Sequence, residues 1–166
     1  MKQSLNNLTR KVEAFSEILE NKGHAVIQQA TTTPHLLCLQ CRIPGKTYYL
    51  YLGRGAQYQG FDFSLKKLPT QFKVQDKFLQ FARHYWRGMK IVDLEVSSKD
   101  RVLRMKGAKE AHIQEMIFFW RGRDLFFVHI KYLGQKIEVF RSWEGKVVEA
   151  WGEDEEIDLN LLFKDL

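Results

Sequence analysis

Turn residues divide the second half of this chain into short apolar segments, and this spacing constrains the possible fold more than any other feature. The segments are rich in Val, Ile, Phe and Tyr, and they cover residues 90–96, 101–107, 113–120, 124–133, 136–143 and 146–151. Short glycine-containing stretches with the sequences RGR, LGQ and EGK separate the last four of them. Strand-like segments with a turn signal every 8–12 residues are typical of antiparallel strands that follow one another in a meander.

Two stretches of the chain have helical periodicity. Apolar residues recur at intervals of four, three and four within residues 4–21, which predicts a helix with Ser4 as its N-cap and Gly23 just after its end. The apolar positions of this helix are Leu8, Val12, Phe15 and Leu19. A second helix is predicted over residues 76–87, and Gly88 is expected to end it.

Between the two helices the pattern changes to short runs of β-branched and aromatic residues. These runs predict strands at residues 24–29, 36–43 and 47–52, and a weaker strand at 58–63. Pro44 and Gly45 are expected to form the tip of a hairpin, because proline and glycine suit the two central positions of a tight turn. Residues 64–75 are predicted to be a polar connection.

The order of these elements predicts the α+β class. The expected architecture is an antiparallel β-sandwich or partly open barrel with two helices, because many short antiparallel strands must bury one face against each other. A chain of 166 residues suits a single domain with a substantial core. We expect this domain to cover residues 1–151, followed by an acidic C-terminal tail or linker over residues 152–166.

Charge is unevenly distributed along the chain. Residues 1–148 contain 25 Lys or Arg and 13 Asp or Glu, a net charge of +12, whereas residues 149–166 carry −6. Such a basic body indicates a polyanionic partner, although excess lysine can also serve solubility alone. No run of apolar residues is long enough to span a membrane, and the N-terminal MKQSLNNLTRK lacks the apolar segment of a signal peptide. We therefore expect a cytoplasmic protein.

Sequence signals for catalysis or for a bound metal are weak. The chain has no P-loop, no nucleophile elbow and no HExxH motif, and its five histidines are scattered. Cys38 and Cys41 have the spacing of half a zinc site, but no second ligand pair follows, so buried free thiols are expected. His129 lies among apolar residues and is predicted to be a core histidine. We expect no enzyme activity, no cofactor and no metal.

The stretch SSKDRVLRM, residues 97–105, places an acid beside a base where a strand is predicted to begin. Asp100 and Arg101 can be a simple turn before a solvated strand edge. Alternatively, the acid can hold the guanidinium in one rotamer, ready to donate two hydrogen bonds to a phosphate. On the second interpretation the candidate RNA-binding residues are Asp100, Arg101, Arg83, His84, Arg87, Arg104, Arg121 and Arg123.

The segment FLQFARHYWRGMKIVDLEVSSKDRVLRM, residues 78–105, resembles the signature of the N-terminal domain of the NFACT family. That family has a Phe-led helix ending in arginine, a basic residue and a glycine, then an Ile-rich strand and an Asp-Arg pair. The corresponding residues here are Phe78, Arg83, His84, Gly88, Ile91, Leu94, Asp100 and Arg101. The segments HAVIQQA, GFDFS and IFFWRGRDLFFV are similar to other family strands in order and spacing, so the resemblance covers about residues 5–130.

The resemblance implies a fold similar to the N-terminal domain of formamidopyrimidine-DNA glycosylases. It also implies binding to tRNA and the large ribosomal subunit, as in the RqcH-like factors of ribosome-associated quality control, with Asp100 and Arg101 matching the pair implicated in tRNA handling. Further domains of a longer chain are expected from the same resemblance. Older descriptions call such proteins fibronectin-binding proteins.

Departures from the family pattern keep two alternatives open. Phe118 or Phe119 stands where the family has a glutamate, and Arg121 replaces its methionine. The first alternative is therefore a protein-interaction or adhesion module that keeps the fold without the tRNA site. The second is a repair protein of the glycosylase type, but those enzymes use a proline at position 2 as nucleophile and this chain has Lys2.

Overall fold

A computed structural model describes residues 3–33, 35–55, 59–67, 77–122, 124–133, 136–143 and 146–148. Its elements follow in the order α1 (Leu5–Lys22), β1 (Ala25–Thr32), β2 (Leu36–Ile43), β3 (Lys46–Gly53), β4 (Gly60–Ser64), α2 (Lys77–Trp86), β5 (Lys90–Val96), β6 (Val102–Lys109), β7 (His112–Arg121), β8 (Asp124–Leu133), β9 (Lys136–Trp143) and β10 (Lys146–Val148). The predicted acidic tail at 152–166, the end of the domain at 151 and most of the connection at 64–75 lie outside the described residues.

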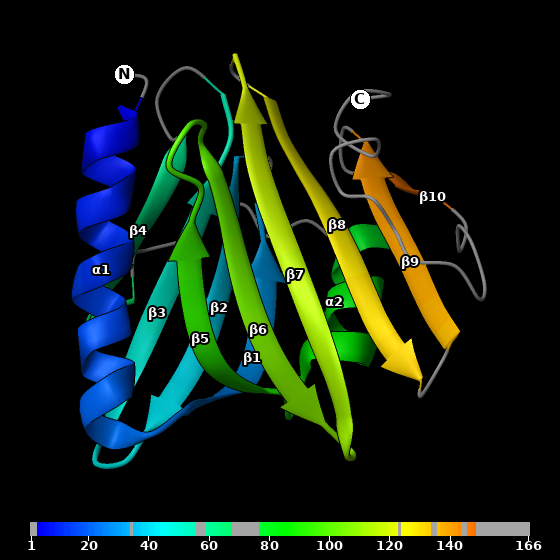
Figure 1. Ribbon diagram of the computed structural model, residues 1–166, viewed down its shortest axis with the longest axis horizontal. Coiled ribbons are helices and arrows are strands. Elements are labelled where there is room, and N and C mark those ends of the chain that lie inside the picture. Colours follow the sequence, from blue (N-terminus) through cyan, green and yellow to red (C-terminus); the bar gives the residue numbers. More distant parts are fainter. Residues whose placement is uncertain are drawn as a thin grey trace.

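The described strands form one antiparallel sheet that folds over on itself. Their order across the sheet is β10-β9-β8-β7-β6-β5-β1-β2-β3-β4. Figure 1 shows β1 to β4 as one layer behind a second layer that contains β5 to β8. The two layers are joined where β1 pairs with β5, over only two residue pairs. The sequence predicts the α+β class with an antiparallel sandwich or partly open barrel, and the structure confirms it: the sheet is antiparallel and is not closed into a barrel.

The two helices close the sides of this sandwich. Helix α1 packs against β4 and β5, and helix α2 packs against β1 and β10, so each helix joins one layer to the other. Ser4 caps α1 by accepting a hydrogen bond from the Asn7 N–H at 3.1 Å, and Gly23 ends the helix with a φ of 97°. These are the two residues that the sequence predicts as helix boundaries. Neither helix in the described part is both long and apolar enough to cross a membrane.

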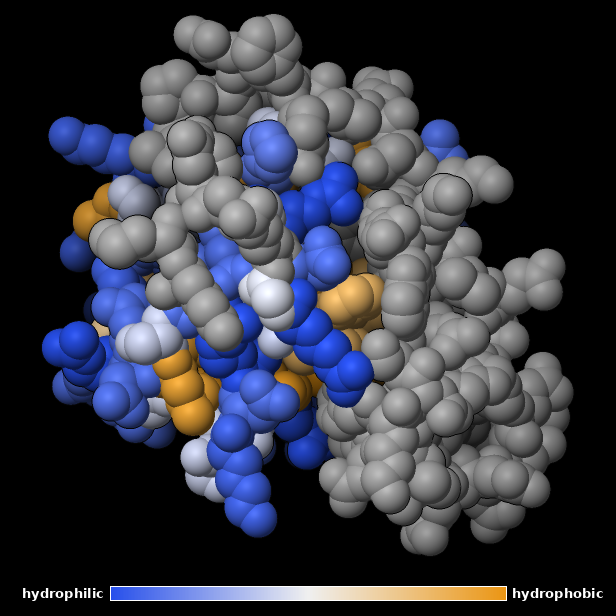
Figure 2. Space-filling model, turned by 90° about the horizontal axis from the view of Figure 1, so that it is seen from above, coloured by the Kyte–Doolittle hydropathy of each residue, from blue (hydrophilic) through white to orange (hydrophobic). Residues whose placement is uncertain are grey.

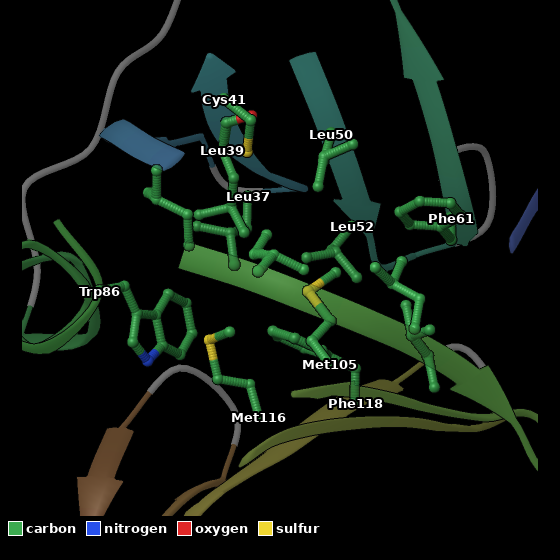
Figure 3. Packing of buried hydrophobic residues seen from close by; sticks show 14 of the residues in the cluster. Leu37, Leu39, Cys41, Leu50, Leu52, Phe61, Trp86, Met105, Met116 and Phe118 are labelled. Atoms are coloured by element: carbon green, nitrogen blue, oxygen red, sulfur yellow. The ribbon is translucent and has the colours of Figure 1, made fainter. Parts of the chain in front are cut away.

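The main core lies between the layers. Side chains from β2 and β3 face side chains from β6 and β7, and Trp86 of α2 completes the cluster at one side (Figure 3). The labelled members of this cluster are Leu37, Leu39, Cys41, Leu50, Leu52, Phe61, Trp86, Met105, Met116 and Phe118. Successive side chains of a strand point to opposite faces of a sheet. Apolar residues at every second position therefore all face the space between the two layers.

Several strands are longer than the sequence predicts. Strand β1 continues from the predicted end at residue 29 to Thr32, because Thr31 and Thr32 pair with the next strand. At their shared turn, β6 extends by two residues and β7 by one beyond the predicted bounds, and Lys109 pairs with His112. The predicted hairpin at 44–45 is present, with Ile43 opposite Lys46 and Gly45 at a φ of 89°.

Candidate functional site

The Asp100–Arg101 pair lies in the turn between β5 and β6, at the end of the sandwich where α1 begins. Asp100 is exposed, and its carboxylate accepts a hydrogen bond of 2.7 Å from the backbone N–H of Arg101. The backbone N–H of Ser97 donates to the carbonyl of Val102 at 3.0 Å, which closes the turn. Asp100 therefore holds the backbone of the turn.

The Arg101 side chain points into the protein and is only 7% exposed. Its guanidinium donates to the side-chain oxygen of Gln59 at 2.7 Å, to the backbone carbonyl of Gln3 at 3.5 Å and to that of Gly122 at 3.4 Å. Burial lowers the pKa of Arg101 below its usual value, and the nearby charge of Asp100 opposes part of this shift. Three oxygens from three distant parts of the chain thus satisfy a buried cation.

These partners are themselves connected. The Gln59 amide also donates to the carbonyl of Gly122. The Gln3 side chain accepts from the Phe61 N–H at 2.7 Å and donates to the Phe61 carbonyl at 2.8 Å. We call Gln3, Gln59, Arg101 and Gly122 the arginine network. It ties the start of the chain, the approach to β4, the β5–β6 turn and the β7–β8 turn together at one end of the sandwich.

Sequence reasoning identified Arg101 but none of its three partners. Gln3, Gln59 and Gly122 belong to no recognisable sequence motif, and they are far apart along the chain. One weak signal is Gly60, whose φ of 127° few other residues adopt, and whose missing side chain leaves the space that the Gln3 side chain occupies. Viewed from the end that holds this network, the coloured surface is mostly hydrophilic (Figure 2).

The other candidate residues are divided between two ends and one face of the sandwich. Arg121 is exposed near the arginine network, with its guanidinium 5.9 Å from the centre of the Phe119 ring. Arg104 lies on the outer face of β6 and forms an ion pair of 2.8 Å with Glu115. Burial lowers the pKa of Arg104, but the hydrogen bond and charge of Glu115, together with the charges of Glu95 and Tyr132, outweigh burial and raise this pKa overall. Arg123 lies outside the described residues.

The remaining three candidates lie at the opposite end. Arg83, His84 and Arg87 are exposed along and just after the last turn of α2, where Lys109 at the far end of β6 donates to the carbonyl of His84 at 3.1 Å. Strand β6 begins next to Arg101 and runs to Lys109, and a strand of this length spans roughly 26 Å. The structure therefore does not bring Arg83, His84 and Arg87 together with Arg101.

The predicted core histidine and the predicted buried thiols are confirmed. His129 is 0% exposed, and its Nδ1 atom accepts a hydrogen bond from the Trp86 indole at 2.9 Å. Burial lowers the pKa of His129 to about 3, so the imidazole is neutral at pH 7. Cys38 and Cys41 are free and buried, and burial raises the pKa of both thiols. Within the described ranges, no group of three His, Cys, Asp or Glu side chains is placed to hold a metal.

Comparison with solved structures supports the same fold. The N-terminal domain of the fibronectin-binding protein PavA from Streptococcus pneumoniae is 18% identical over 81% of this chain and 54% of its own, with a TM-score of 0.63. The N-terminal part of the fibronectin/fibrinogen-binding protein from Streptococcus suis is also 18% identical, over 78% of this chain and 50% of its own, with a TM-score of 0.62.

A third structure, the fibrinogen-binding protein from Staphylococcus aureus, is 14% identical over 78% of this chain and 47% of its own, with a TM-score of 0.59. The chain thus spans about half the length of these structures. No family model matches the sequence, and no curated protein matches it. At these identities the comparison shows a shared fold.

Proposed function

We propose that this chain is a non-catalytic module that binds another protein, of the type that recognises fibronectin or fibrinogen. The observation that carries this proposal is the inward direction of Arg101. Its guanidinium is buried and occupied by three carbonyl or amide oxygens, so it is not presented to a phosphate. The structural neighbours support the proposal, since all three are described as binding fibronectin or fibrinogen.

The direct test is binding of the purified chain to immobilised fibronectin and to immobilised fibrinogen, with serum albumin as a control surface. We expect saturable binding to at least one of the two, with a dissociation constant in the micromolar range or tighter, typical of a specific though transient interface. Binding to neither protein, or equal binding to albumin, contradicts the proposal.

A second candidate is a tRNA-binding module that acts at the large ribosomal subunit, as the NFACT resemblance implies. One observation favours it. Residues 1–148 carry +12, and Arg83, Arg87, Lys90 and Lys109 form a basic patch at the end of the sandwich opposite the arginine network. This candidate requires the cytoplasm, whereas adhesion requires the cell surface, so the location of the chain distinguishes the two.

Salt dependence tests the tRNA candidate. If three to five phosphates are neutralised, the affinity for tRNA falls by about 10² or more between 50 and 200 mM salt. Arg83→Glu with Arg87→Glu should abolish this binding, whereas Arg10→Glu with Lys46→Glu changes the net charge equally at exposed positions elsewhere and should weaken it less. An affinity that is flat with salt, or absent at low salt, rules the candidate out.

A further inference from the structure

Strand β4 lies at one edge of the described sheet, and its free edge runs beside helix α1 (Figure 1). On its other side β4 pairs with β3, where Phe61 is opposite Leu52 and Phe63 is opposite Leu50. In an antiparallel pair, every second residue directs its N–H and C=O away from the partner strand. The contacts of Phe61 with Gln3 show that Phe61 is such a residue, so Phe63 is one as well.

The Gln3 side chain takes the place of a neighbouring strand at Phe61. Its amide oxygen accepts from the Phe61 N–H at 2.7 Å, and its amide nitrogen donates to the Phe61 carbonyl at 2.8 Å. Two residues of adjacent antiparallel strands exchange the same reciprocal pair of hydrogen bonds. The edge of β4 thus already binds one amide group in the manner of an added strand.

At Phe63 the partner found among the described residues is a local one. The Phe63 N–H donates at 2.8 Å to the carboxylate of Asp62, the residue before it in the chain. A peptide carbonyl from another chain can replace this short-range contact and leave the carboxylate to water. Such an edge, with backbone groups directed outward, is a ready template for an additional strand.

A groove of about 500 Å³ lies along this edge. One wall is formed by Asn7 and Lys11, four residues apart on one face of the first turns of α1, together with Gln3 just before the helix, and the opposite wall is formed by residues 59–64. An ion pair of 3.1 Å between Lys11 and Asp62 crosses the groove, but the two side chains are 42% and 59% exposed. An ion pair this exposed is weak and opens readily.

We propose that this groove binds an extended segment of a partner protein, which adds as a further strand to β4 at Phe61 and Phe63 and displaces the Gln3 side chain. This rests on the proposed function, since it assigns the surface through which the module would recognise a protein. Hydrogen bonds to the backbone of β4 supply the binding, and alternate side chains of the segment face α1 and solvent in turn. A segment that alternates apolar and polar residues fits this geometry.

The groove suits a peptide better than a nucleic acid. Among the described residues that line it, the polar groups are mostly neutral amides and backbone groups, and the one cation, Lys11, is paired with Asp62. Phosphate recognition depends on clustered positive charge, which this groove does not offer. Outward-facing donors and acceptors on alternate residues of one strand match the repeat of an extended peptide instead.

The test uses eight-residue peptides displayed on phage and selected on the whole folded chain, followed by synthesis of the selected peptide. Asn7→Trp places a bulky side chain in the groove, and Asn6→Trp is its matched control, because Asn6 is the exposed neighbour on the same helix and does not line the groove. We expect Asn7→Trp to weaken peptide binding by at least tenfold and Asn6→Trp to leave it unchanged. Gln3→Ala should tighten binding, because the peptide no longer competes with the Gln3 amide.

Amide hydrogen exchange locates the peptide independently of the variants. The peptide should slow exchange at Phe63, whose N–H gains an inter-strand hydrogen bond. Failure to select any peptide, equal affinity for wild type and Asn7→Trp, or protection confined to another part of the chain overturns the proposal.

Fibronectin and fibrinogen binding by the same variants separates this proposal from the proposed function. If the chain binds either protein and Asn7→Trp does not weaken that binding, the groove proposal fails while the proposed function stands. If the selected peptide binds in the groove but the chain binds neither protein, the groove proposal stands and the proposed function fails.

Discussion

Replacing Arg101 with alanine should destabilise the fold, because the guanidinium is a structural part of the sandwich. The substitution removes one short hydrogen bond of 2.7 Å and two long ones of 3.4 and 3.5 Å, and it leaves the side-chain oxygen of the buried Gln59 without this donor. A hydrogen bond to a charged group contributes about 1.5–3 kcal/mol, and the two long bonds count for less, so the expected loss is about 2–4 kcal/mol. For a chain of this length, that loss lowers Tm by roughly 5–15 °C.

Urea unfolding followed by circular dichroism measures this loss, with Arg121→Ala as the matched control. Arg121 is exposed at the same end of the sandwich and its guanidinium lies near the Phe119 ring, so its replacement should change the free energy of unfolding by no more than about 1 kcal/mol. Arg101→Lys should fall between the two, since one ammonium group cannot reach oxygens on three separate segments. If Arg101→Ala unfolds at the same urea concentration as Arg121→Ala, the arginine network does not stabilise the fold and the reasoning is refuted.

Three further predictions follow from buried groups. The folded state holds the pKa of His129 at about 3, below the unfolded value of 6.5, so the stability tied to this group is complete above pH 6.5 and is lost as pH falls toward 3, by up to about 1.4 kcal/mol per pH unit. Comparing urea unfolding of wild type and His129→Gln at pH 7.5 and 4.5 should show the steeper loss in wild type. Gly60→Ala should cost about 1–3 kcal/mol in a Tm measurement, and more than Gly45→Ala, because both have positive φ but only Gly60 meets another side chain. Cys38 and Cys41 should react with a thiol reagent only after denaturation, because burial raises the pKa of both; rapid reaction of the folded chain contradicts this.

The candidate site shows where prediction from sequence reached its limit. The sequence indicates that Asp100 and Arg101 form either a plain turn or a pair in which the acid positions the arginine. In the structure the two residues form a turn, and the Arg101 side chain is held in one position, but not by Asp100. Asp100 binds the backbone of the turn, while Arg101 is positioned by partners that no local pattern connects to it. Gln59 and Gly122 lie 42 and 21 residues away from Arg101 along the chain, so only the folded arrangement of strands brings them together.

The basic residues illustrate the same limit. Arg83, Arg87 and Arg101 are close in sequence, which predicts that they belong to one site. Strand β5 carries the chain from the end of the sandwich at α2 to the opposite end, and this traverse separates the two arginines of α2 from Arg101. A single strand between two charged residues can therefore place them at opposite ends of a domain, even when they are close in sequence.

Local chemistry determined the helices and most strands of this protein. Ser4, Gly23 and Gly45 act on their immediate neighbours through caps and turns. The alternation of apolar residues determines which face of each strand is buried. Both features can therefore be predicted from the sequence. Tertiary structure alone decided the direction of Arg101, the strand-like contact of Gln3 with β4 and the groove beside it. Each of these depends on which distant segments become neighbours when the sheet folds over on itself, and a buried polar group takes whichever partners that packing provides.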